Sequence, residues 1–184
     1  MRNSNTQLHL RYTILAALFA AMVYVLTAFV HIPTQQGYVH VGDSVIYLAA
    51  SLLPMPYAIA ASAIGAGLSD FLSGYAMWVV PTILIKSMTA AVFSSQGAKI
   101  IRRRNLLAII PAGVICVAGY YIAGALLALF SGTPAAAAFT AALADIPTNL
   151  IQVAGSSVLY VVLGTAMDKA GIKRFAQPKG ACSR

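Results

Sequence analysis

Polar side chains that could bind or react are scarce in this sequence, and most of them interrupt long apolar stretches. If these stretches are helices with 3.6 residues per turn, two of them carry a polar stripe along one face. The first stripe comprises Trp78, Thr82, Lys86 and Thr89. The second comprises Asp145, Asn149, Gln152 and Ser156. One cation, several amides and hydroxyls, and an aromatic ring suit the binding of a small, flat, polar molecule.

Each of these side chains also has a purely structural interpretation. Lys86 could pair with Asp70 or Asp145 and hold helices together, although ionisable groups within a membrane more often mark functional sites. Trp78 could belong to an interfacial aromatic belt. We favour a binding site that includes Asp70, Trp78, Lys86, Asn149 and Gln152.

The stretch GYVHVGDSVIYLAA, residues 37–50, adds further candidates at the start of an apolar run. Asp43 or Ser44 could cap the helix that begins there, because both side chains accept hydrogen bonds from a helix N-terminus. Asp43 could instead contact a ligand, together with Tyr38 and His40. The histidines lack a third ligand nearby, so we predict no metal site.

Catalytic signatures are not evident in the sequence. It contains no phosphate-binding P-loop and no GxSxG or HExxH motif. Its two cysteines, Cys116 and Cys182, follow no disulfide or zinc pattern. We therefore expect a protein that is not an enzyme and needs no cofactor.

The composition indicates that the helices carrying these polar residues lie in a membrane. Of the 184 residues, 60% are hydrophobic and 9% are charged, whereas a soluble domain carries roughly a quarter charged residues. The net charge of +8 is concentrated before the first apolar stretch, in the middle loop with Arg102–Arg104, and after the last stretch. This distribution predicts cytoplasmic N- and C-termini and argues against nucleic-acid binding.

We predict an all-α integral membrane protein, with a single domain over residues 1–184. Six helices form one transmembrane bundle, because an even number of spans leaves both termini and the middle loop on the cytoplasmic side. The predicted helices cover residues 12–30, 44–53, 57–72, 78–101, 106–130 and 136–167, followed by a cytoplasmic tail over 168–184. A proline after Met55 separates the second helix from the third. The loop between the first two helices overlies the polar stripes.

Small residues recur at helical spacing in the first predicted helix. Ala16 and Ala20 are four residues apart, as are Ala17 and Ala21. Small residues at this spacing let two helices approach closely in lipid.

Taken together, the small-residue pattern, the stretch at 37–50, and the segments GLSDFLSGYAMWVVPTILIK and DIPTNLIQ resemble a known family. They are similar to the substrate-binding S components of energy-coupling factor (ECF) vitamin transporters, and most similar to the riboflavin, hydroxymethylpyrimidine and pyridoxine group. The resemblance covers Arg11 to Lys169.

This resemblance implies a binding subunit of an ATP-driven importer in the plasma membrane of a prokaryote. A small water-soluble vitamin would bind near the outer face, under the loop between the first two helices. The partners would be a membrane T subunit and two cytoplasmic ATPases. The family's docking surface for the T subunit maps onto Ala16 and Ala20, with Ala17 and Ala21 as the adjacent register.

The predicted pocket residues do not identify the substrate. The stretches HVGDSVIYLAA and PTILIK favour hydroxymethylpyrimidine or a pyridoxine-like compound, and riboflavin or another B vitamin is the alternative. Two other classes of protein remain, a stand-alone carrier of small solutes and an intramembrane enzyme. Inverted repeats would favour the carrier, and a nucleophile beside a base would favour the enzyme. Neither feature is visible in the sequence.

Overall fold

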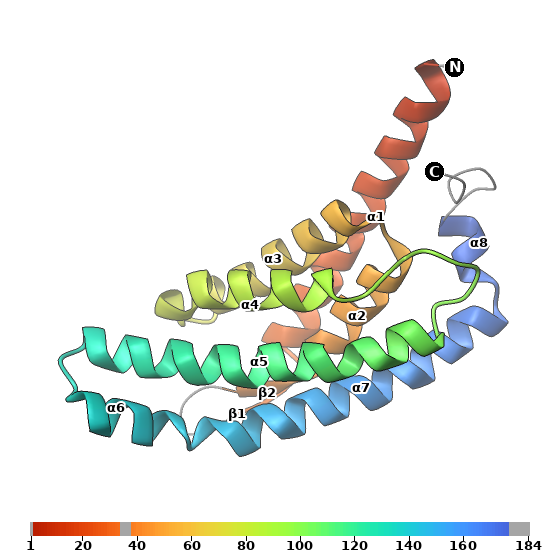
Figure 1. The fold of residues 1–184 in the computed structure, drawn as a ribbon. Coiled ribbons are helices and arrows are strands. Elements are labelled where there is room, and N and C mark those ends of the chain that lie inside the picture. The colour runs from red at the N-terminus through yellow and green to blue at the C-terminus, as the bar shows by residue number, and fades with distance from the viewer. Residues whose placement is uncertain (1, 34–37, 177–184) are drawn as a thin grey trace.

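The structure is a computed structural model that describes residues 2–33 and 38–176 (Figure 1). Helices dominate it, and a short antiparallel pair of strands joins the first two helices. In chain order the elements are α1 (Arg2–Ala28), β1 (His31–Pro33), β2 (Tyr38–His40), α2 (Gly42–Leu52), α3 (Met55–Leu72), the 3₁₀ turn η1 (Ala76–Trp78), α4 (Val79–Ala91), α5 (Arg103–Phe130), α6 (Ala135–Ala142), α7 (Asp145–Lys169) and α8 (Ile172–Ala176).

The helices form one bundle around α2. Every residue of α2 is buried, and this helix contacts α1, α3, α4 and α7. The helices α5 and α7 run antiparallel along one side, α4 lies beside α5, and α3 lies beside α4 (Figure 1). Because α2 is buried on every side and its polar residues Asp43 and Ser51 are paired inside the bundle, this helix forms the centre of the molecule.

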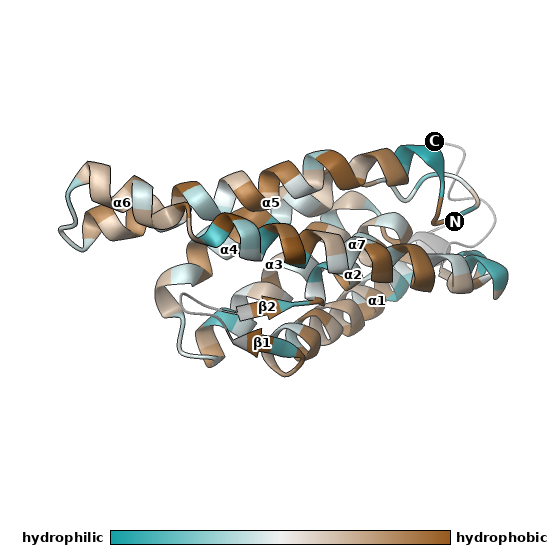
Figure 2. Ribbon diagram, turned by 90° about the horizontal axis from the view of Figure 1, so that it is seen from below, coloured by the Kyte–Doolittle hydropathy of each residue, from teal (hydrophilic) through white to brown (hydrophobic). Residues whose placement is uncertain are grey.

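Apolar residues predominate along the outer helices, as the hydropathy colouring in Figure 2 shows, and many of their large side chains are exposed. Within the described residues, three helical stretches are long and apolar enough to cross a membrane, Thr6–Ala28, Arg103–Phe130 and Ala135–Lys169. A shorter apolar stretch covers Ala76–Ala91. The hydrophilic start of α5, with Arg103 and Arg104, lies at one end of the bundle (Figure 2).

Several predicted helices differ from the observed ones. The first begins at Arg2 and not at Tyr12, and the short helix α8 lies within the predicted tail over 168–184. The fourth ends at Ala91 and not at Ile101, and the chain continues as a loop in which Gly97 has a φ of 88°. The sixth is divided into α6 and α7. Pro147 explains the division, because its ring would clash with the carbonyl of Leu143, four residues earlier.

The segment between α1 and α2 contains a strand pair that an all-α architecture does not include. His31 pairs with His40, and Ile32 pairs with Val39. The tip of this connection, residues 34–37, lies outside the described residues. The first residue of α2, Gly42, packs so closely against α1 that a Cβ atom there would overlap Thr27 Oγ1.

Candidate functional site

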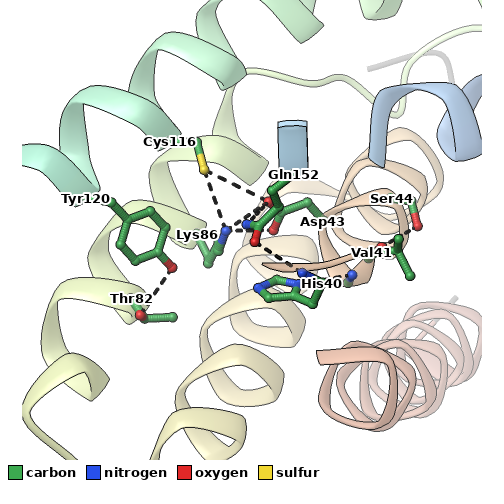
Figure 3. A network of polar contacts seen from close by, with 10 residues as sticks. His40, Val41, Asp43, Ser44, Thr82, Lys86, Cys116, Tyr120 and Gln152 are labelled. Atoms are coloured by element: carbon green, nitrogen blue, oxygen red, sulfur yellow. Dashed lines mark hydrogen bonds and ion pairs between the residues drawn. The ribbon is translucent and has the colours of Figure 1, made fainter. Parts of the chain in front are cut away.

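An ion pair between Asp43 and Lys86 lies at the centre of the polar region (Figure 3). Lys86 Nζ lies 2.7 Å from Asp43 Oδ1 and 2.9 Å from Oδ2. Both side chains are completely buried. The two charges therefore neutralise each other inside the bundle, which is where an unpaired charge would be most costly.

Gln152 and His40 extend this pair toward the connection between α1 and α2. Gln152 Nε2 donates a hydrogen bond to Asp43 Oδ2 at 3.0 Å. The backbone N–H of His40 donates to Gln152 Oε1 at 3.3 Å. Strand β2 is thus tied to α7 and, through Gln152, to the ion pair, as Figure 3 shows.

The ring of His40 folds back onto the start of α2. The N–H of Gly42 donates to His40 Nδ1 at 3.1 Å, so this ring nitrogen carries no proton. Burial lowers the pKa of His40 to about 4, against an opposing effect of the Asp43 carboxylate. His40 is therefore neutral at physiological pH.

Aromatic rings lie on the other side of Lys86. The ammonium group lies 5.0 Å from the centre of the Tyr120 ring, within the range of a cation–π interaction. The Tyr120 hydroxyl lies 3.2 Å from Thr82 Oγ1, and its ring is tilted against Trp78 at 5.9 Å. These contacts position α5 against η1 and α4.

A cavity of ≈ 80 Å³ opens between these groups. Its lining comprises Thr27, His40, Ala66, Asp70, Tyr75, Trp78, Thr82, Lys86, Tyr120, Asp145, Thr148, Asn149 and Gln152. Thr27 Oγ1 is buried and has no hydrogen-bond partner among the described residues. A buried hydroxyl without a partner costs about 1–3 kcal/mol, so a ligand that bonds to Thr27 would remove this cost.

The structure brings most of the sequence-predicted site residues to this cavity. His40, Asp70, Trp78, Lys86, Asn149 and Gln152 line it. Asp43 lies directly behind it, bonded to Lys86 and Gln152. Tyr38 belongs to β2, but its side chain lies outside the described part of the structure.

Two structural interpretations drawn from the sequence were wrong. The partner of Lys86 is Asp43, and not Asp70 or Asp145. Asp43 is not a helix cap, because α2 begins at Gly42 after Val41 and no side chain caps it. The carboxylate turns inward to Lys86 and Gln152 because these groups compensate its buried charge.

Sequence reasoning missed several residues of the site region. Thr27, Tyr120 and Thr148 line the cavity, and Cys116 Sγ lies 3.8 Å from Lys86 Nζ. Thr148 lies three residues after Asp145, which places it on the same helix face, so the polar stripe could have included it. Thr27, Cys116 and Tyr120 lie in apolar stretches whose sequence does not show which face of the helix is turned to the interior of the bundle.

The two alanine pairs of α1 lie in different surroundings. Ala16 and Ala20 are each only 8% exposed, and the carbonyl of Ala20 lies close to Gly65 of α3. Ala17 and Ala21 are exposed. Ala20 therefore packs against α3, and the second pair is the more accessible of the two, while docking of a T subunit on this helix stays a prediction.

Among the described residues, no group of three or more His, Cys, Asp or Glu side chains could hold a metal ion. The chain matches the family described as "ECF-type riboflavin transporter, S component" over residues 7–169. No curated protein matches the chain.

Proposed function

We propose a function from one premise: this chain belongs to the family of ECF-type riboflavin transporter S components. It is accordingly a membrane protein and a vitamin-binding subunit of a transporter, and not an enzyme.

We propose that the cavity beside the Asp43–Lys86 pair binds the vitamin. The observation that carries this proposal is the buried ion pair at the wall of a cavity that Trp78, Tyr120 and Thr27 also line. In the part of the chain that the structure describes, the Thr27 hydroxyl has no hydrogen-bond partner. Aromatic faces and convergent polar groups are typical of sites for small heteroaromatic molecules.

The charges around the cavity favour a ligand without a phosphate group. The charge of Lys86 is matched by Asp43, and Asp70 and Asp145 add carboxylates to the lining. A phosphorylated vitamin would bring further negative charge beside these two carboxylates. A neutral ring with amino or hydroxymethyl groups can donate hydrogen bonds to these carboxylates.

The size of the cavity favours one ring. Its volume of ≈ 80 Å³ is well below the roughly 300–1,000 Å³ of sites for drug-sized ligands. Hydroxymethylpyrimidine and pyridoxine-like compounds have a single ring and no phosphate group, and we propose this class as the substrate. Riboflavin is the second candidate, because it appears in the description of the matching family.

Trp78 provides a direct test, because it is the sole tryptophan of the chain and lines the cavity. We expect hydroxymethylpyrimidine or pyridoxine to change its fluorescence in the purified protein in a saturable manner. Riboflavin binding would be followed by its own flavin fluorescence. Saturable binding of riboflavin alone would overturn the single-ring proposal and leave the transport function intact.

A Thr27→Val variant tests whether the ligand occupies this cavity. Valine keeps the shape of threonine and removes the hydroxyl, so we expect about tenfold weaker binding, equivalent to about 1.4 kcal/mol. Thr13→Val is the matched control, since Thr13 is exposed on the same helix. Equal affinity of the two variants would place the ligand elsewhere.

We further propose six membrane crossings with both termini in the cytoplasm of a prokaryote. The crossings are α1, α2, α3, η1 with α4, α5, and α6 with α7. The basic residues in the α4–α5 loop and after α7 support this orientation. In this arrangement the ligand cavity faces outward, with β1 and β2 next to it. A membrane T subunit and two ATPases would complete the importer.

A further inference from the structure

A second cavity lies at the opposite end of the bundle from the ligand site. It has a volume of ≈ 360 Å³ and forms where the α4–α5 loop meets the junction of α7 and α8. Its lining comprises Ala98, Lys99, Asp168, Lys169, Ala170, Gly171, Lys173 and Arg174. These residues come from two segments that are about 70 positions apart in the sequence.

Hydrogen bonds fix the floor of this cavity. Lys173 Nζ donates to the carbonyl oxygens of Ser51 at 2.8 Å and Lys99 at 3.2 Å, and Lys173 is 3% exposed. The two oxygens of Asp168 accept the N–H groups of Ile100 at 2.7 Å and Ile101 at 2.9 Å. The loop and α8 are therefore held in place without any bound molecule.

The rim of the cavity carries basic side chains that are available to an anion. Lys99, Lys169 and Arg174 are exposed. Their charged ends make no hydrogen bond or ion pair with any described residue. Four basic residues and one acidic residue line the cavity, which gives a net charge of +3. Both oxygens of that one acid, Asp168, accept backbone N–H groups, which offset part of its negative charge.

Apolar side chains flank this basic rim. On α8, Ile172 is 37% exposed and Phe175 is 69% exposed, and their spacing of three residues places them on one side of the helix. The candidate membrane span also ends at Lys169. A phosphate group in the cavity would thus lie beside apolar surface at the edge of the membrane.

We propose that this cavity binds the phosphate of an anionic phospholipid in the cytoplasmic leaflet. The proposal rests on the orientation proposed above and is independent of the vitamin. Lysine and arginine bind phosphate oxygens through charge-assisted hydrogen bonds, and basic pockets on the cytoplasmic side bind anionic lipid headgroups. The flanking Ile172 and Phe175 favour a lipid over free phosphate, because acyl chains cover apolar side chains.

The test compares two variants that lose the same charge. Lys169→Ala/Arg174→Ala removes two rim residues, and the control Arg11→Ala/Arg103→Ala removes two exposed basic residues that do not line the cavity. Native mass spectrometry of the full chain measures phosphatidylglycerol retained from mixed phosphatidylglycerol and phosphatidylcholine. At about fivefold per basic residue, we expect roughly thirtyfold weaker retention in the rim variant than in the control.

Equal retention by the two variants would overturn the site. A second arm titrates inorganic phosphate into protein in phosphatidylcholine nanodiscs and measures the unfolding temperature. We expect stabilisation by phosphatidylglycerol and none by millimolar phosphate. Equal stabilisation by phosphate would overturn the lipid assignment in favour of a soluble anion. Binding of the vitamin is measured in the same samples, and its presence or absence reports on the outer cavity alone.

Discussion

At the scale of single residues, the pairing of Lys86 with Asp43 determines what the site can recognise. A lysine that is fully matched by an internal carboxylate cannot also neutralise an anionic ligand. It can still orient the site, because it holds Asp43 and lies over the ring of Tyr120. We therefore assign to Lys86 the positioning of the cavity wall.

Removing the cation alone is expected to be more harmful than removing both charges. In Lys86→Met, the buried carboxylate of Asp43 loses its cation, and breaking such a pair costs about 3–5 kcal/mol. We expect a lower unfolding temperature and at least tenfold weaker vitamin binding. Asp43→Asn/Lys86→Met is the control, and it should recover part of the lost stability. A wild-type unfolding temperature for Lys86→Met would contradict this account.

The neutral His40 predicts acid sensitivity of the folded protein. Its pKa is about 4 when folded and about 6.5 when unfolded, so the unfolded chain binds more protons between these values. The contribution of His40 to the free energy of unfolding is therefore fully present above about pH 6.5. It falls as the pH decreases toward 4, with a loss on the order of 2 kcal/mol at pH 5. Unfolding temperatures of the wild type and His40→Gln, measured from pH 7.5 to pH 5, test this. Parallel curves would argue against it.

At the scale of elements, α2 connects the two ends of the bundle. Its first turn holds Asp43, in the ligand region. Near its last turn, the Ser51 hydroxyl bonds to Tyr160 at 2.9 Å and accepts from Asn105 Nδ2 at 3.2 Å. The Ser51 carbonyl accepts from Lys173. One buried helix therefore reaches from the candidate site to Asn105 and Lys173, which in turn bond to the loop that is proposed to face the cytoplasm.

Asn105 is expected to stabilise that loop without affecting the ligand. Its Nδ2 donates to the carbonyls of Ser94 at 2.9 Å and Ile100 at 3.1 Å, and its Oδ1 accepts the N–H of Ser94. Asn105→Ala leaves several buried groups unpaired, at about 1–3 kcal/mol each. We expect a lower unfolding temperature and near-normal vitamin affinity. An affinity loss as large as that of Lys86→Met would show that the two regions are coupled.

The exposed face of α1 is the part of that helix that a T subunit could reach. Ala17→Trp should leave vitamin affinity near the wild-type value and abolish uptake, because the ring would hold the two helices apart. Ala20→Trp should damage folding instead, since Ala20 is buried against α3. Affinity of the isolated variants and uptake by the complete transporter distinguish these outcomes. Normal uptake with Ala17→Trp would place the docking surface elsewhere.

At the scale of the whole molecule, sequence patterns predicted where helices occur better than they predicted where each helix ends. They also did not predict which side chains of different helices pair. Apolar length and helical spacing located the polar stripes of α4 and α7. The early end of α4 depends on Asn105, which binds Ser94 from a later helix. The break before α7 had a local signal in Pro147 that was overlooked. The Asp43–Lys86 pair joins residues 43 positions apart, and helical periodicity carries no information about such pairs.

The central place of α2 has a consequence for the order in which the protein is made. At 11 residues and 1.5 Å per residue it is about 16 Å long, which is shorter than the roughly 30 Å apolar layer of a bilayer. Its polar partners Lys86, Gln152 and Lys173 are all synthesised after it, the last of them 122 residues after Ser51. The Asp43 carboxylate has no cation to pair with until Lys86 has been synthesised, 43 residues later. The bundle can close only when almost the entire chain has emerged.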